Sequence, residues 1–293
     1  MKLLISGSSG LFGSALVRRA ISSGYTCQSL DRSSVALSLD ATARDALDAM
    51  LVGVDHLVHA AANTNVERCE AEPQTCYRDN VLLTELLAAA ARRCGVPMTV
   101  ISSTGVYGSH LQRPYAEFDE AHPQTHHHKS KLLAERAVLS AAEANLVLRT
   151  GWLFGGEASA PKNFVARRIL EARSTPDGFI SSNQQQRGCP THVEDLADRL
   201  LALLALNAQG VFNAVNEGTA SRFEYVREIV ERAGLNVQVR PVAAGSFNRV
   251  APVSDNETAI NWRANELGLP PMRSWQSALT NYLAGDEMKA LIV

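Results

Sequence analysis

The sequence predicts an α/β protein: a Rossmann-type, doubly wound parallel sheet with a smaller C-terminal substrate lobe. Short apolar runs alternate with helical patterns up to about residue 150, a glycine-rich loop joins the first run to the first helix, and the alternation then becomes irregular. Strands that are apolar throughout belong to parallel sheets covered by helices on both faces. We therefore expect a dinucleotide-binding Rossmann domain over residues 1–155 and a substrate-binding lobe over residues 156–293, parts of which return to the first domain.

The apolar spacing also predicts the individual elements. Apolar runs predict strands at 2–6, 26–31, 56–60, 99–102 and 145–149. Helical spacing predicts helices at 11–23, 41–51, 78–94 and 129–144, and in the C-terminal lobe at 164–172, 193–206, 222–233 and 273–283. The segments between the C-terminal helices are rich in Gly, Pro, Asn and Ser. We expect the ligand site in the cleft between the two lobes.

The composition excludes several classes of protein. With 46% hydrophobic and 20% charged residues, the chain can bury a normal core, and disorder is not indicated. A formal net charge of −2 provides no basic field, so we expect no nucleic-acid partner. The 5 cysteines form no CxxC pair, which argues against a disulfide framework or a structural zinc site. Because the apolar runs are too short for a bilayer span or a signal peptide, we expect a cytoplasmic protein without a membrane partner.

The glycine-rich loop is the firmest functional motif. The segment GSSGLFG places Gly7, Gly10 and Gly13 directly after a strand and at the start of a helix. The first glycine permits a tight turn, the second allows the backbone to approach a pyrophosphate, and the third allows close packing of helix and strand. Backbone N–H groups at the helix N-terminus then face the anion. We predict that this loop, including Leu11 and Phe12, binds a nicotinamide dinucleotide.

Two charged residues at the end of the second strand bear on which dinucleotide is bound. Asp31 lies about 20 residues after the loop, where a carboxylate accepts hydrogen bonds from the ribose hydroxyls of NAD. Arg32 is adjacent and is suited to the 2′-phosphate of NADP. The sequence therefore leaves the choice between NAD and NADP open.

Further motifs follow in order along the first 200 residues. They are SLDAT at 38–42, VHAAA at 58–62, RDNV at 78–81, SSTGVYG at 102–108, HKSKLLAE at 128–135, LRTGWLFG at 148–155, NF at 163–164 and QRGCPTHVEDLA at 186–197. Together with the glycine loop, this series resembles the extended short-chain dehydrogenase/reductases, and most closely their dTDP-4-dehydrorhamnose reductase branch. The resemblance implies an NAD(P)-dependent oxidoreductase that reduces a keto group of a nucleotide-linked sugar. A nucleotide-sugar epimerase or dehydratase is the alternative enzyme.

The resemblance also implies roles for individual residues. Ser103 would hydrogen-bond the substrate carbonyl, and Lys131 would bind the nicotinamide ribose. The other residues implied to contact or support the cofactor are Asp40, Ala60, Ala61, Ala62 and Asn80. Those implied to border the substrate are Thr104, Tyr107, Trp152, Asn163, Gln186 and Thr191. In this family the helices equivalent to 78–94 and 129–144 often build a dimer interface, so we expect a homodimer.

The chain departs from the family pattern at one catalytic position. The family has Tyr-x-x-x-Lys, a spacing that puts both side chains on one helix face, whereas this chain has His127 before Lys131. Three interpretations remain open: His127 is the general acid, another group such as Tyr107, a neighbouring histidine or a substrate hydroxyl supplies the proton, or the protein is a non-catalytic cofactor-binding regulatory subunit. Consecutive helical residues diverge by about 100°, so we expect no metal site at His126, His127 and His128.

Overall fold

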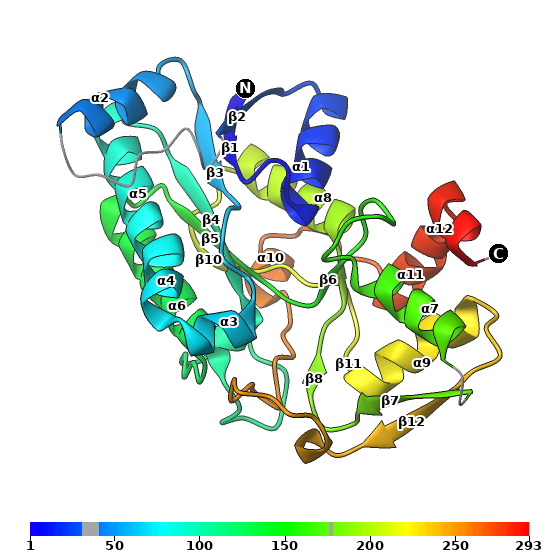
Figure 1. Cartoon of the computed structure of the whole chain (residues 1–293). Helices are drawn as coiled ribbons and strands as arrows, with labels where there is room; N and C mark the ends of the chain where they lie inside the picture. The colour runs from blue at the N-terminus through cyan, green and yellow to red at the C-terminus, as the bar shows by residue number, and fades with distance from the viewer. Residues whose placement is uncertain (31–40, 176–177, 293) are drawn as a thin grey trace.

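The computed structural model describes residues 1–30, 41–175 and 178–292, and it confirms the predicted α/β class. Its centre is a six-stranded sheet in the order β10-β5-β4-β3-β1-β2, in which each neighbouring pair is parallel (Figure 1). The strands are β1 (Lys2–Ser6), β2 (Thr26–Leu30), β3 (His56–His59), β4 (Met98–Ser103), β5 (Leu146–Thr150) and β10 (Gly210–Asn213). The strand order reverses between β1 and β3, and open α/β sheets bind their ligands at such a switch point.

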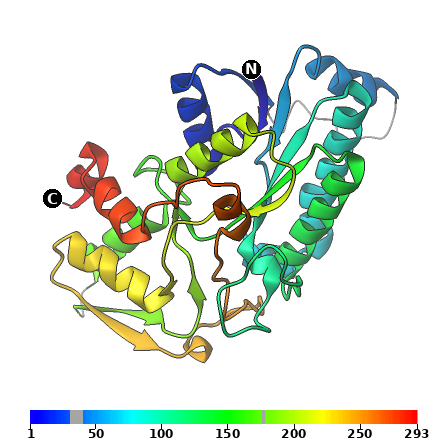
Figure 2. The same ribbon diagram turned by 180° about the vertical axis from the view of Figure 1, so that it is seen from behind.

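Helices cover both faces of this sheet (Figures 1 and 2). Leu3 and Ile5 of β1 pack in one core with α1 (Leu11–Ser22) and α8 (Val193–Ala205). Leu4, between them in sequence, packs on the opposite side with the core that includes α2 (Ala41–Met50), α5 (Leu83–Cys94) and α6 (His126–Ala141). This alternation follows from the two-residue period of a strand. Within the described residues, no helix is long and apolar enough to cross a membrane.

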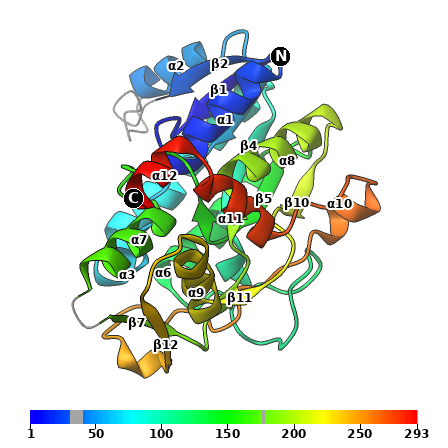
Figure 3. The same ribbon diagram turned by 90° about the vertical axis from the view of Figure 1, so that its right-hand side faces the viewer.

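Part of the second half of the chain returns to the central sheet. β10 pairs with β5 along residues 210–213, and α8 packs beside α1. The helix α10 (Trp262–Glu266) packs on β10, and its Ala264 lies in the same core as α1 and α8. Most of the remaining elements surround a separate core that includes Phe154, Tyr225 and Trp275 (Figure 3). The remaining elements are β6 (Leu153–Phe154), α7 (Phe164–Ser174), β7 (Phe179–Asn183), β8 (Arg187–Gly188), β9 (Thr191–His192), β11 (Ala220–Ser221), α9 (Arg222–Arg232), β12 (Gln238–Val242), η4 (Ala244–Ser246), α11 (Trp275–Leu283) and α12 (Asp286–Ile292). The division at residue 155 stays a prediction.

The observed elements differ from the predicted ones near the end of β3 and before α6. The structure adds α3 (Val66–Ala71) and α4 (Pro73–Tyr77), and the helix predicted from residue 78 begins as a π-helical turn, η2 (Arg78–Leu82). A short 3-10 helix, η3 (Thr104–Tyr107), follows β4. The helix predicted from residue 129 begins at His126, because the side chain of Thr125 accepts a hydrogen bond from the backbone N–H of His128. All three consecutive histidines therefore lie in its first turn.

Candidate active site

The glycine loop between β1 and α1 needs glycine for two separate reasons. Gly7 has a φ of +78°, and a Cβ on it would lie 2.6 Å from the backbone nitrogen of Ala61. A Cβ on Gly13 would collide with the carbonyl oxygen of Gly7. The N-cap residue, Gly10, offers no side-chain cap, so N–H groups of the first turn of α1 are left for an anion. This cradle fits the pyrophosphate of a dinucleotide.

The structure places the three predicted alanines beside this loop. Ala60, Ala61 and Ala62 follow β3 directly and are partly buried, and the backbone N–H of Ala60 donates to the carbonyl of Ser6 at 2.9 Å. Leu11 is also partly buried, whereas the side chain of Phe12 packs in the core. A cofactor contact at Phe12 would therefore come from its backbone. The predicted residues Asp31, Arg32 and Asp40 lie outside the described residues.

His127 is held by the backbone of the loop that follows β3. Its Nδ1 lies 3.0 Å from the carbonyl oxygen of Asn63. Asn80, within the π-helical turn η2, fixes Asn63 from the other side: its Oδ1 accepts from the Asn63 N–H at 2.7 Å, and its Nδ2 donates to the Asn63 carbonyl at 3.1 Å. Asn63, in the loop after β3, is therefore bound both to Asn80 of η2 and to His127 of α6.

Ser130 closes this network within α6. Its hydroxyl donates to the His127 carbonyl at 2.7 Å and accepts from Asn80 Nδ2 at 2.9 Å. Asn80 and Ser130 are both buried. Asn80, predicted as a cofactor-side residue, is thus a buried amide that sets the position of the His127 backbone.

The three histidine rings turn to three different partners. His126 Nδ1 lies 3.2 Å from the Tyr77 hydroxyl, whereas His128 Nδ1 lies 3.1 Å from Thr125 Oγ1. Burial lowers the pKa of His127 to about 3, with further contributions from His128 and Lys131, and burial lowers that of His128 to about 4. Both rings are therefore neutral at pH 7. Within the described residues, no group of three or more His, Cys, Asp or Glu side chains could hold a metal ion.

Lys131 lies one helical turn after His127 and is buried. Burial lowers its pKa to about 8, and the nearby carboxylate of Glu135 partly opposes that shift. Glu135 binds Arg149 of β5 through Oε1 at 3.0 Å and Oε2 at 2.6 Å, and it also accepts from Ser102. The negative charge of Glu135 is thus already paired with Arg149, which explains why it does not restore the ordinary pKa of Lys131.

Ser103 is the last residue of β4, the strand next to β3, and Thr104 opens η3 directly after it. Ser103 is partly buried, and its Oγ accepts from the backbone N–H of Gly105 at 3.1 Å. The hydroxyl of Thr104 is buried and has no hydrogen-bond partner within the described residues. Gly105 is required because a Cβ there would collide with the ring of His128. This contact packs the end of β4 against the first turn of α6.

Three of the predicted substrate residues have buried side chains with partners of their own. The Tyr107 hydroxyl donates to Asn213 at 2.8 Å, in the core beside β10. Asn163 caps α7 by accepting from Ala166 at 3.1 Å. Thr191 donates to the Cys189 carbonyl at 3.0 Å. These hydrogen bonds account for the burial of the three side chains, and their place beside the substrate stays a prediction.

Trp152 and Gln186 meet at an arginine that the sequence did not single out. The Arg222 guanidinium lies 3.4 Å from the centre of the Trp152 ring, and Arg222 donates to Gln186 Oε1 at 3.5 Å. Trp152 also donates to the buried Glu257 at 2.9 Å. Burial lowers the pKa of Arg222 to about 10. Arg222 opens α9 behind a Ser cap, so in the sequence it resembles an ordinary first-turn residue.

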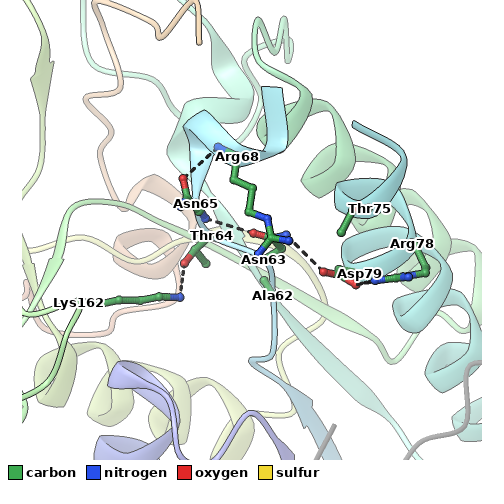
Figure 4. Close-up of a pocket in the computed structure, with 9 residues that line it drawn as sticks. All are labelled: Ala62, Asn63, Thr64, Asn65, Arg68, Thr75, Arg78, Asp79 and Lys162. Atoms are coloured by element: carbon green, nitrogen blue, oxygen red, sulfur yellow. Dashed lines mark hydrogen bonds and ion pairs between the residues drawn. The ribbon is translucent and has the colours of Figure 1, made fainter. Parts of the chain in front are cut away.

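A polar cavity of about 280 Å³ opens beside Ala62 (Figure 4). Lys162, which precedes α7, donates to Thr64 at 2.7 Å and links the second half of the chain to the loop after β3. The cavity is lined by Ala62, Asn63, Thr64, Asn65, Arg68, Thr75, Arg78, Asp79 and Lys162. Sequence motifs include only Ala62, Arg78 and Asp79 of this wall. The other lining residues carry no motif, because they come together from the loop after β3, α3, α4 and the segment before α7.

Comparison with known proteins covers nearly the whole chain. A family model described as the RmlD substrate binding domain matches residues 1–288. The dTDP-4-dehydrorhamnose reductase of Mycobacterium tuberculosis is 34% identical over 289 residues, which cover 97% of this chain and 92% of that protein. The crystal structure of a dTDP-4-dehydrorhamnose reductase from Clostridium acetobutylicum matches with a TM-score of 0.88 at 27% identity, covering 97% of this chain and 98% of that one. The Bacillus anthracis enzyme in complex with NADP matches at 24% identity, covers 96% of this chain and 98% of its own, and supports the fold.

Proposed function

Because the chain belongs to the RmlD substrate-binding domain family, we propose that it is an NAD(P)-dependent reductase acting on a keto group of a dTDP-linked deoxysugar. The observation that carries this proposal is the match over residues 1–288, which includes both the glycine loop and the C-terminal half. The relative from Mycobacterium tuberculosis is named for reduction of dTDP-4-dehydrorhamnose, a sugar of this class.

The cofactor would lie across the switch point of the sheet. The backbone of the glycine loop would hold its pyrophosphate, and the alanines after β3 would let it approach closely. When bound, the reduced nicotinamide supplies hydride to the carbonyl carbon. The choice between NAD and NADP stays open, because Asp31 and Arg32 lie outside the described residues.

Ser103 and Lys131 would act on the carbonyl oxygen as it becomes negatively charged. The Gly105 N–H already donates to Ser103 Oγ, so the serine hydroxyl hydrogen is free to be donated to the substrate. Lys131 would bring positive charge close to the developing oxyanion. Trp152 and Arg222 would form the wall that receives the nucleotide-linked part of the substrate.

Turnover of a defined substrate tests this proposal. The full chain is mixed with dTDP-4-dehydrorhamnose and either NADPH or NADH, and oxidation of the nicotinamide is followed by absorbance. We expect steady oxidation that depends on the keto-sugar. Tight cofactor binding without oxidation of the nicotinamide by any dTDP-linked keto-sugar would contradict the reductase and favour the regulatory subunit.

We also propose a homodimer formed through α5 and α6, as the resemblance implies. Leu133 of α6 is 40% exposed, which leaves an apolar side chain on the outer surface of this helix pair. Light scattering should give twice the mass of one chain, and Leu133→Glu should return it to one. A single-chain mass for the unaltered protein would contradict the dimer. A cytoplasmic location likewise stays a prediction.

A further inference from the structure

The hydrogen bond of His127 determines which ring nitrogen carries the proton. A backbone carbonyl oxygen can only accept, so the His127 Nδ1 that lies 3.0 Å from the Asn63 carbonyl must be the protonated nitrogen. Asn80 holds that carbonyl in place, as described above. In the neutral ring, Nε2 then carries a lone pair and no proton.

This lone pair borders space that a ligand can reach. Nε2 of His127 has no hydrogen-bond partner in the described part of the chain. This atom is also not fully enclosed by the protein. The whole residue His127 is 6% exposed, so its accessible part is small. The charged and titratable groups acting on the ring are His128 and Lys131 on α6 and Lys162 from the segment before α7. All three disfavour the imidazolium.

The neighbouring side chains do not offer a replacement acid. The ring of His128 is enclosed against Gly105, and the Tyr107 hydroxyl donates to Asn213. His126 turns to Tyr77. Ser103 can donate a hydrogen bond, but a serine hydroxyl is too weak an acid to transfer its proton fully to the substrate oxygen.

Lys131 is the buried lysine in the first two turns of α6, whereas Lys129 is exposed. It lies one turn from His127 and is buried. The titratable groups acting on it in the described residues are Glu135 of α6, Cys76 of α4 and His59 of β3, and the Glu135 carboxylate is already bound to Arg149 through both oxygens. An ammonium group without a counter-ion of its own releases a proton more readily than an exposed one.

We propose that His127 accepts a hydrogen bond at Nε2 from a hydroxyl of the bound ligand, and that Lys131 gives the reduced oxygen its proton. This assignment rests on the proposed reductase function. The carbonyl carbon gains two electrons and a hydrogen as hydride from the reduced nicotinamide, and the π bond of the C=O group breaks onto oxygen. That oxygen takes one proton from Lys131 Nζ, and solvent then reprotonates the resulting amine.

The proposed acceptor role of His127 is tested by finding which of its ring nitrogens carries the proton. This measurement does not need an active enzyme. The full chain is labelled with ¹⁵N in its histidine rings, and His127→Phe identifies the signals of His127. We expect a protonated Nδ1 and an unprotonated Nε2 from pH 5 to 8. A proton on Nε2 at pH 7 overturns the acceptor role. If the chain lacks reductase activity, the proposed function fails, yet these ring signals still decide the role of His127.

The pH dependence of kcat tests the second half. With Lys131 as the acid, kcat is flat from pH 5 to 7 and falls tenfold per pH unit above the pKa of about 8. With His127 as the acid, kcat instead falls tenfold per unit through the whole range from 5 to 8, because the pKa of its ring is about 3. That second profile overturns the proposal.

Three variants complete the test. Lys131→Arg keeps the charge but cannot release a proton, so we expect a kcat at least about 100-fold lower and no fall of kcat above pH 8. An unchanged kcat overturns the role of Lys131. His127→Gln can still accept a hydrogen bond, whereas His127→Phe cannot, so Phe should weaken ligand binding about 10-fold and Gln much less. Weaker cofactor binding assigns the hydroxyl to the ribose, a raised KM assigns it to the sugar, and equal effects of Gln and Phe overturn the acceptor role.

Discussion

The glycine loop and the first turn of α6 are built in different ways. The loop is defined by its backbone: Gly7 and Gly13 are needed because any side chain would collide with main-chain atoms. The turn is defined by side chains, with Asn80 and Ser130 holding the backbone to which His127 is attached. A backbone device fixes the residue type, so the sequence reveals it directly. A side-chain device can accept another residue without any change of fold, as His127 illustrates.

The largest expected effect on ligand binding tests the glycine loop, whose shape is set by its backbone. In Gly13→Ala the added Cβ would collide with the Gly7 carbonyl, so the loop must open and cofactor affinity should fall at least about 100-fold. Gly245→Ala is the matched control, because a Cβ there meets nothing within 4 Å. Nicotinamide fluorescence titration measures both variants. Equal affinities would show that the loop does not bind the dinucleotide.

The second effect concerns the ion pair behind the side-chain device. Arg149→Met leaves the buried carboxylate of Glu135 without its partner, so the free energy of unfolding should fall by about 3–5 kcal/mol. Arg68→Met removes an exposed pair with Glu72 and should cost less than about 1 kcal/mol. Urea denaturation compares the two. Similar losses would contradict the claim that burial gives the Arg149 pair its importance.

The third effect is a pH dependence that α6 has and the glycine loop lacks. The pKa of His127 is 6.5 in the unfolded chain and about 3 in the folded one, so below pH 6.5 the unfolded chain binds the extra proton. Its contribution to stability is therefore complete above pH 6.5 and declines as the pH falls towards 3. Between pH 7 and 5 this histidine should cost about 2 kcal/mol at most. Urea denaturation at several pH values gives the slope of the unfolding free energy against pH for the unaltered chain and for His127→Phe. We expect a shallower slope for the variant, and equal slopes would contradict the depressed pKa of His127.

The smallest effect separates a helix cap at the site from one elsewhere. Thr125→Ala and Ser274→Ala each remove an N-cap and should each lower the free energy of unfolding by about 1 kcal/mol. Only Thr125 also lies against the ring of His128, at 3.1 Å. We therefore expect a lower kcat for Thr125→Ala alone. A similar kcat in both variants would show that the first turn of α6 tolerates movement.

Local sequence patterns were sufficient to predict the elements whose central residues are all buried. The strand predicted at 2–6 is β1 (Lys2–Ser6), because its central residues Leu3, Leu4 and Ile5 each face a helix layer. β10 was missed because its four residues, GVFN, acquire their pairing only from β5, far away in the chain. The π-helical turn at Asn80 was missed for a similar reason: it is fixed by contacts with Asn63 and Ser130.

In the candidate site too, sequence motifs reveal the residues placed by one strand or helix, but not those placed by distant contacts. The glycines, Ser103 and Lys131 could be named from motifs, since spacing along one strand or helix places them. Lys162 and Arg222 could not, because their partners Thr64 and Trp152 lie in other parts of the chain. The tautomer of His127 depends on a carbonyl of the loop after β3, which no spacing rule within α6 reveals.

The return of β10 to the central sheet has a consequence for biosynthesis. The ribosome must translate the chain as far as Asn213 before β10, the last strand of the central sheet, is complete. The helix α8, which covers α1, is completed only shortly before β10. A nascent chain of 155 residues would expose the edge of β5 and the apolar surface that α8 later covers. Residues 1–155 expressed alone should therefore aggregate, and folding of the first half during translation should wait for the second.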